Sequence, residues 1–279
     1  MISLLAFTLL IAAGSFLAGL LGSLTGLGGG VIIVPLLTLV FHVDIRYAIG
    51  ASLVSVIATS SGAAAAYLKE GYSNIRVGMF LEVATTLGAL CGAFLATRIP
   101  TAAIAIVFAA VLMYSAWTSI RAEAPVPIHG STDAIAERLK LDGTYPGESG
   151  AIAYHVHRVP LGFGLMYVAG TLSGLLGIGS GAVKVLAMDR AMSIPFKVST
   201  TTSNFMIGVT AAASAGIYLH RGYIDPGLSM PVMLGVLAGA LLGARILPGA
   251  RVRTLRLVFG VAIAAVAVEM MFQALKGRI

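Results

Sequence analysis

Two glycine-rich runs, at 24–35 and 173–185, interrupt apolar sequence and have the composition of an anion site. Glycines at this density do not sustain a regular helix, because each costs about 1 kcal/mol relative to alanine in a helix interior. A helix that begins after such a break presents unpaired backbone N–H groups and about half a positive charge. Two such N-termini that meet near the middle of a membrane would bind a small anion. The alternatives are close packing of helices on the glycines and a loop at the membrane surface.

The expected binding residues are small or carry hydroxyl and amide groups, which can hold an oxyanion without adding a charge. In the first half of the chain they are Thr25, Gly26, Gly28, Gly29, Gly30 and Ser52. In the second half they are Gly177, Gly179, Ser180 and Gly181, followed by the polar run Thr200, Thr201, Thr202, Ser203 and Asn204. Hydrogen bonding between helices is the alternative role for that polar run.

Charged residues inside apolar segments are functional candidates by default. Lys184, directly after the second break, would add a full positive charge to the anion site, or it would snorkel to the membrane interface. Glu82 could carry a coupling proton, and Glu269 is a weaker candidate for the same role. A salt bridge or a position at the interface would explain either acid equally well. Asp189 and Arg190 are expected to pair where their segment reaches the surface.

The sequence lacks the residue patterns of nucleophilic enzymes, dinucleotide sites and metal sites. No histidine lies deep in an apolar segment, so Ser180 has no base to make it a nucleophile, and no enzyme activity is expected. The glycine runs lack the full G-x-G-x-x-G spacing of dinucleotide sites. His129, His155 and His157 have no further metal ligand close by in sequence. We therefore expect neither a metal nor a cofactor.

The elements that position these residues must be membrane helices. Of the 279 residues, 58% are hydrophobic and only 10% are charged, and the mean hydropathy is +0.97. Soluble domains carry about 25% charged residues. The net charge of +7 comes from basic residues between apolar segments, which orient a chain in the bilayer rather than bind nucleic acid. The first apolar stretch lacks a basic leader, so we expect it to be retained in the membrane.

The second half of the chain repeats the first at an offset of 151 residues. The offset aligns Gly26–Gly30 with Gly177–Gly181, Ser52 with Ser203, and Tyr67 with Tyr218. We predict an all-α polytopic membrane protein of two tandem repeats, with eight to ten transmembrane segments and glycine-broken helices. Segments are expected near 3–25, 31–42, 47–68, 77–97, 101–120, 160–176, 182–194, 198–219, 228–248 and 254–275, and a short helix with a Ser or Thr cap at 131–140.

The basic residues also predict the topology. If each half crossed the membrane four times, the eighteen Lys and Arg residues would divide nine against nine between the two sides. If the chain reverses at each glycine break, they divide five against thirteen. The positive-inside rule favours the second arrangement. It inverts one repeat relative to the other, leaves both termini outside, and places 121–159 in the cytoplasm.

With the breaks, the repeat and the polar run in place, the chain resembles the TauE/SafE family, often described as sulfite exporters. The resemblance covers about 16–275 and rests on LTGLGGGVIIVPLL followed by IGASL, and on SGLLGIGSGAVKV followed by FKVSTTTSN. It implies a permease of bacterial or archaeal cytoplasmic membranes for sulfite, organosulfonates or related small anions. Leu186 replaces Pro35 and Ser180 replaces a glycine of the first break, so exact symmetry of the site is not expected.

Together these features predict a secondary transporter that moves a small anion by alternating access. Its expected organisation is a first transmembrane repeat at 1–120, a cytoplasmic connection at 121–159 and a second transmembrane repeat at 160–279. The expected partners are the anion and the lipid bilayer, with a homodimer as a further expectation and no nucleic acid. The alternatives are an intramembrane enzyme acting on a lipid or sulfur intermediate, and a membrane scaffold or sensor.

Overall fold

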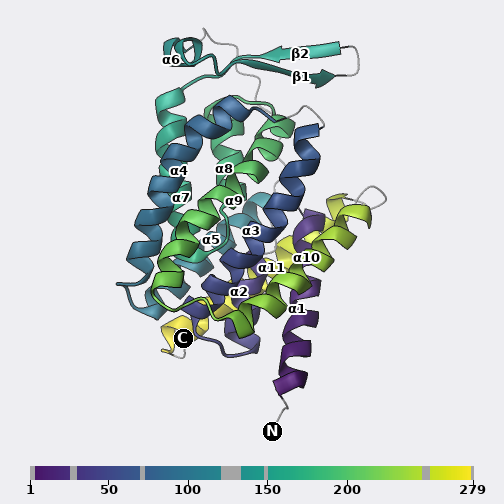
Figure 1. Cartoon of the computed structure of the whole chain (residues 1–279), viewed down its shortest axis with the longest axis vertical. Coiled ribbons are helices and arrows are strands. Elements are labelled where there is room, and N and C mark those ends of the chain that lie inside the picture. The colour runs from purple at the N-terminus through teal and green to yellow at the C-terminus, as the bar shows by residue number, and fades with distance from the viewer. Residues whose placement is uncertain are drawn as a thin grey trace.

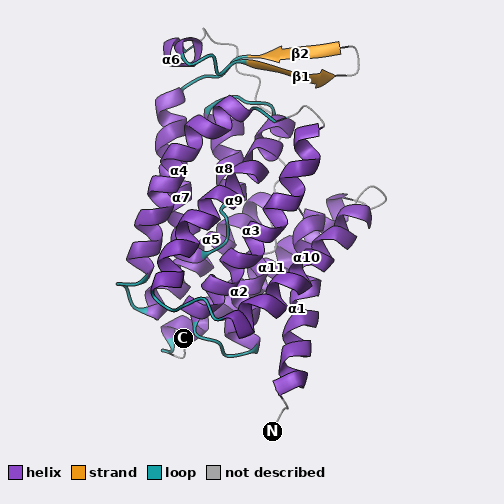
Figure 2. Cartoon of the chain, viewed as in Figure 1, coloured by secondary structure: helices purple, strands orange, loops and turns teal. Residues whose placement is uncertain are grey.

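A computed structural model describes residues 4–25, 30–69, 73–120, 133–147, 150–246 and 252–277 of the chain. Helices dominate it (Figures 1 and 2). The first half contains α1 (Leu4–Thr25), α2 (Gly30–Pro35), the π-helical turn η1 (Leu36–Val40), α3 (Ile45–Lys69), α4 (Ile75–Ala96) and α5 (Thr101–Ile120). The second half contains α7 (Val159–Leu176), α8 (Gly181–Leu186), the π-helical turn η2 (Ala187–Ala191), α9 (Phe196–His220), α10 (Pro226–Ile246) and α11 (Val252–Leu275).

The elements of the two halves follow one another in the same order. Adding 151 to the bounds of α2, η1 and α3 gives the bounds of α8, η2 and α9 to the residue. The π-helical turn forms in both halves, although Leu186 stands where the first half has Pro35. The proline is therefore not what widens the helix there.

Glycines set the closest contacts between helices. A β-carbon on Gly88 in α4 would lie 2.1 Å from the Tyr167 carbonyl oxygen in α7, and one on Gly239 in α10 would lie 2.0 Å from the Phe16 carbonyl oxygen in α1. Such approaches need residues without a side chain. The offset of 151 residues relates Gly88 to Gly239 and Phe16 to Tyr167. The pairs α1–α10 and α4–α7 therefore pack in the same register. These small-residue faces pack helices against one another within one chain.

Four helices of the described residues are long and apolar enough to cross a membrane. Their apolar stretches are Leu5–Gly22, Ile75–Ala96, Val159–Leu176 and Pro226–Gly243. Both chain ends lie at one end of the molecule, and a β-hairpin lies at the other (Figure 1).

That hairpin belongs to a small cap, which is formed by residues between the first and second halves of the sequence. The cap contains α6 (Ala134–Arg138) and antiparallel strands β1 (Gly143–Gly147) and β2 (Gly150–Tyr154), with Gly143 paired to Tyr154. The all-α prediction is therefore wrong for this segment. Its Pro146-Gly147 and Gly150 carry turn chemistry between β-forming Thr, Tyr and Ile residues, which stabilises a hairpin over a plain linker.

Side chains anchor the cap to the helices beneath it. Asn74, at the N-terminus of α4, donates from Nδ2 to the Tyr154 hydroxyl at 2.7 Å and to the Leu141 carbonyl at 2.9 Å. Asp133 accepts from the backbone N–H of Ile135 and of Val159, each at 2.9 Å, and so caps both α6 and α7. The prediction of a Ser or Thr cap for this short helix is wrong, because the aspartate reaches two helix starts at once.

Candidate functional site

Left-handed backbone separates two helices at the second glycine run. Helix α7 ends at Leu176, and Gly177, Gly179 and Ser180 follow with φ values of 67°, 70° and 44° before α8 begins. Ser180 holds this left-handed conformation without the freedom of a glycine, which costs about 1–2 kcal/mol. Its hydroxyl donates to the Ala169 carbonyl at 2.7 Å, and no described side chain caps the start of α8.

The end of the first break lies against the second. The Ser52 hydroxyl in α3 donates to the Gly177 carbonyl oxygen at 2.8 Å. A β-carbon on Gly30 would lie 2.9 Å from that hydroxyl and 3.2 Å from the Gly177 carbonyl oxygen. All three residues are buried. Of the other residues expected here, Thr25 is the last residue of α1, and Gly26, Gly28 and Gly29 lie outside the described residues.

The polar run of α9 divides into residues that reach the break and residues that do not. Ser203, the counterpart of Ser52, donates to the Gly181 carbonyl oxygen at 3.4 Å. Thr200 and Thr201 donate to carbonyls of their own helix. Thr202 accepts from the Asn74 backbone N–H at 3.0 Å, and Asn204 is half-buried. Ser203 therefore contacts the break, whereas the three preceding threonines bond their own helix or the start of α4.

One turn of helix beyond the break, three elements bring charged and hydroxyl groups together. Lys184 in α8 has no exposed surface, and its Nζ donates to Thr210 Oγ1 in α9 at 2.5 Å. Thr210 Oγ1 donates to Glu82 Oε1 in α4 at 2.7 Å, and Thr86 donates to the same oxygen at 3.2 Å. We call Lys184, Thr210 and Glu82 the buried triad. The alternative that Lys184 snorkels to the interface is wrong, because its head group points into the bundle.

The buried triad is incompletely satisfied. An ammonium carries three donors, yet the Lys184 Nζ bonds a single oxygen among the described residues. Glu82 Oε2 is buried and has no described hydrogen-bond partner. Glu82 itself is only 8% exposed. Buried polar groups in native proteins are nearly always paired, so such exceptions indicate a strained site or one that receives a ligand.

Thr210 is the member of this cluster that the sequence analysis missed. Its signal was a polar stripe on α9 made by Ser199, Ser203, Thr210 and Ser214, which are buried and spaced four, seven and four residues apart. That spacing places them on one face of a helix.

The remaining charged candidates have other partners. Arg190 Nε lies 3.8 Å from Asp189 Oδ2, as expected from the sequence. Glu269 is exposed on α11 and accepts from Gln273 Nε2 at 2.8 Å, which leaves it at the surface. His155 Nδ1 lies 2.8 Å from Asp142 Oδ2 in the cap. The described residues contain no group of three potential metal ligands.

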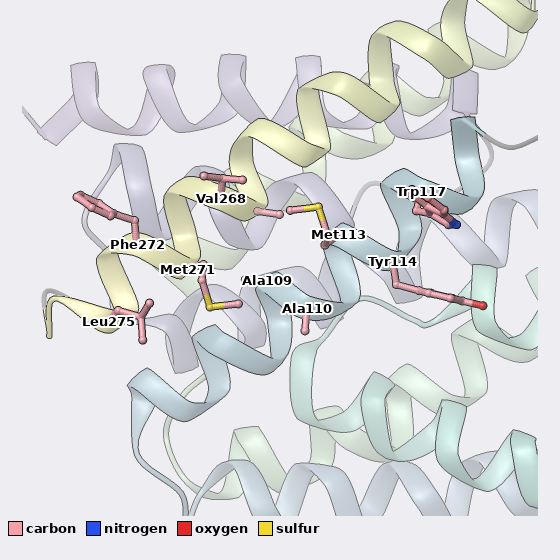
Figure 3. A pocket seen from close by; sticks show the side chains of 10 residues that line it. Ala109, Ala110, Met113, Tyr114, Trp117, Val268, Met271, Phe272 and Leu275 are labelled. Atoms are coloured by element: carbon pink, nitrogen blue, oxygen red, sulfur yellow. The ribbon is translucent and has the colours of Figure 1, made fainter.

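A surface groove between two helices is unsuited to an anion. A groove of about 670 Å³ runs between α5 and α11 (Figure 3). Its lining is apolar and includes Met113, Trp117, Val268, Met271 and Phe272. No charged side chain lines it, which sets it apart from the buried triad.

Comparison with known proteins gives one family. The family model described as "Sulfite exporter TauE/SafE" matches residues 11–270. The probable membrane transporter protein YunE of Bacillus subtilis is 26% identical over 96% of this chain and 98% of its own length. YdhB of the same organism, also named a probable membrane transporter protein, is 27% identical over 85% of this chain and 89% of its own. A probable membrane transporter protein of Methanocaldococcus jannaschii is 26% identical over 87% of each chain. No solved structure gives a significant match.

Proposed function

Since the chain belongs to the TauE/SafE family and is a membrane transporter rather than an enzyme, we propose that it moves a small oxyanion of the sulfite or organosulfonate class. The observation that carries the proposal is Lys184, a cation with no exposed surface that lies beside a break in the helices. The anion would bind between this ammonium and the backbone N–H groups of the two breaks, with Ser52, Ser180 and Ser203 around it.

Energetics support this role for Lys184. Moving an ammonium from water into a protein interior costs several kcal/mol even after relaxation. Charged residues at membrane depth face the interior of a bundle and mark substrate or ion pathways. These groups have almost no exposed surface, since Lys184 is 0% exposed and Ser180 and Ser203 are at most 3% exposed. Burial of this kind is what a transporter needs at its site between its two open states.

We also propose that the two halves are inverted repeats and that transport follows from one rocking against the other. The shared offset of 151 residues and the matched registers of α1–α10 and α4–α7 support a two-fold relation between the halves. The position of both chain ends opposite the hairpin is consistent with a chain that reverses at each break. With the positive-inside rule, this arrangement puts the cap in the cytoplasm and the termini outside an inner membrane.

Flux into proteoliposomes tests the proposal. We expect radiolabelled sulfite or methanesulfonate to enter liposomes that contain the wild-type protein, and Lys184→Met to reduce the rate to the level of empty liposomes. Lys276→Met is the matched control, because Lys276 lies over the Phe272 ring at the end of α11 rather than in the bundle. Full flux of every probe in Lys184→Met would contradict the proposal.

A further inference from the structure

We propose that Glu82 and the transported anion compete for Lys184, and that one proton binds to Glu82 as each anion enters. This inference rests on the proposed function, because it concerns the same lysine. Thr210 is then a positioning residue, because its hydroxyl links Lys184 to Glu82.

The geometry of Thr210 gives the site two alternative states. Its hydroxyl has one proton but two acceptors within reach, Glu82 Oε1 at 2.7 Å and the Met206 carbonyl oxygen at 2.9 Å. A hydroxyl donates one hydrogen bond at a time. When Glu82 is ionised, the proton goes to the carboxylate. When Glu82 is protonated, the Thr210 hydroxyl donates to the Met206 carbonyl instead, and its hydrogen bond to the carboxyl is released.

Charge balance decides which state accompanies the anion. The empty site holds one ammonium and one carboxylate, so its net charge is zero. An anion that bound without protonation of Glu82 would leave a net negative charge in a buried place, where an uncompensated charge is strongly unfavourable. Protonation of Glu82 restores neutrality, because the anion then replaces the carboxylate as the partner of Lys184.

The binding step balances in atoms and charge. A proton from the side to which the site is open adds to a Glu82 oxygen, the hydrogen bond between Thr210 and Glu82 Oε1 is released, and the anion accepts from the Lys184 ammonium. Glu82 Oε2, which has no described partner, is an oxygen available to take that proton. Release on the other side of the membrane reverses each change.

Among the described residues, Lys184 is the charged group that acts on Glu82. Helices α7 and α9 pack against α4, and α8 supplies Lys184. On α7, Tyr167 lies by Cys91, nine residues further along α4. On α9, Lys197 and His220 are at the two ends of the helix, 13 and 10 residues from Thr210, and Tyr218 bonds the Gly174 carbonyl. Asp189 and Arg190 of η2 pair with each other.

Two consequences follow for a monovalent anion. Because proton and anion move together, transport is electroneutral in the wild-type protein. With Glu82→Gln the site keeps its lysine but cannot take up the proton, so each anion carries its own charge across the membrane. The substitution therefore changes what drives transport, and it preserves the shape of the side chain.

Accumulation of methanesulfonate in proteoliposomes tests this, because the anion of a strong acid stays unprotonated across the pH range used. We expect wild-type protein to accumulate it about tenfold for each pH unit of an inward proton gradient, since one proton is linked to one anion. A potential imposed with potassium and valinomycin should leave that ratio unchanged. In Glu82→Gln we expect the opposite, with accumulation that follows the potential and ignores the pH gradient.

Matched variants separate this inference from the proposed function. Glu269→Gln, which changes an exposed glutamate held by Gln273, should behave as wild type. Wild-type flux that ignores the pH gradient, yet is lost in Lys184→Met, would overturn the coupling and leave the transport function standing. Flux that survives in Lys184→Met would overturn both.

Infrared spectroscopy gives a second readout that does not depend on flux. Addition of methanesulfonate should produce the C=O absorption of a protonated carboxyl in wild-type protein and in Glu269→Gln, and the band should be missing in Glu82→Gln. The same band in Glu82→Gln would overturn the assignment to Glu82.

Discussion

The buried triad and the three residues that match it under the 151-residue offset differ in chemistry, and each set draws residues from both halves of the chain. The offset of 151 residues relates Lys184 to Ile33, Thr210 to Thr59 and Glu82 to Met233. Ile33 is fully buried, as Lys184 is. Thr59 donates to the Ser55 and Val56 carbonyls of its own helix, the ordinary state of a threonine in a helix. Matching positions of the two halves thus hold one charged set of residues and one uncharged set.

This difference shows that the shared architecture does not by itself require charge at these positions. The apolar set fits the same helices, and burying an ion pair instead adds little stability or none. The charges of Lys184 and Glu82 therefore do not follow from the architecture alone, which is why we propose a binding role for them. Under the proposed function, the comparison predicts one anion per chain, bound on the side of α8.

The largest expected effect on the free energy of unfolding comes from replacing Lys184 by an apolar residue, as stands at the matching position Ile33. Lys184→Met leaves Glu82 without its counter-charge, and loss of one partner of a buried pair costs about 3–5 kcal/mol. Ile33→Met, the matched change in the other half, conserves apolar volume and should cost less than about 1.5 kcal/mol. Chemical unfolding in detergent measures both free energies.

Removing the second charge should then recover much of that loss. The double variant Lys184→Met with Glu82→Leu replaces the pair by apolar groups, which is often neutral or stabilising. We expect its free energy of unfolding to return to within about 1–2 kcal/mol of wild type while transport stays absent. A double variant as unstable as Lys184→Met would show that the two residues do not interact.

A smaller effect is expected at the threonines. Thr210→Val removes the one hydroxyl that bonds both charged groups but leaves the two charges in place, and loss of a hydrogen bond to a charged group costs about 1.5–3 kcal/mol. Thr59→Val removes only a bond to the backbone of its own helix, so it should cost less than about 1 kcal/mol. Thr210→Ser keeps the hydroxyl and should restore both stability and the response of flux to a pH gradient. An equal loss of unfolding free energy in Thr210→Val and Thr59→Val would show that Thr210 has no special role between the charged groups.

Much of this architecture was predictable from periodic features of the sequence. The bounds of α2, α3, α8 and α9 follow from glycine breaks, apolar length and the 151-residue offset, because these are local properties repeated twice. The cap was less predictable, since its hairpin depends on a turn and on contacts with Asn74.

The buried triad lay beyond sequence reasoning for a different reason. Lys184 and Glu82 were recognisable as charges in apolar segments, but a threonine inside a helix carries no sign of its partner. Thr210 and Glu82 are 128 residues apart, and only the packing of α4 against α9 brings them together. The offset could still have directed attention to them, because it pairs each of the two charges with an apolar residue.

The smallest expected effect concerns the cap, which lies outside the membrane helices. Hydrogen bonds from the backbone N–H of Ile135 and then of Val159 lower the pKa of Asp133 below its ordinary value of 3.8. A carboxyl with a lowered folded pKa stabilises the folded state above its unfolded pKa, and that contribution is lost as the pH falls through the folded value. Protection of these two amides from hydrogen exchange should therefore decrease below about pH 4. Asp133→Asn keeps a capping oxygen without the charge, so the difference between the two proteins at each pH isolates Asp133 from the neighbouring Asp142–His155 pair. A difference that stays constant from neutral to acid pH would show that the carboxylate charge does not hold α6 to α7.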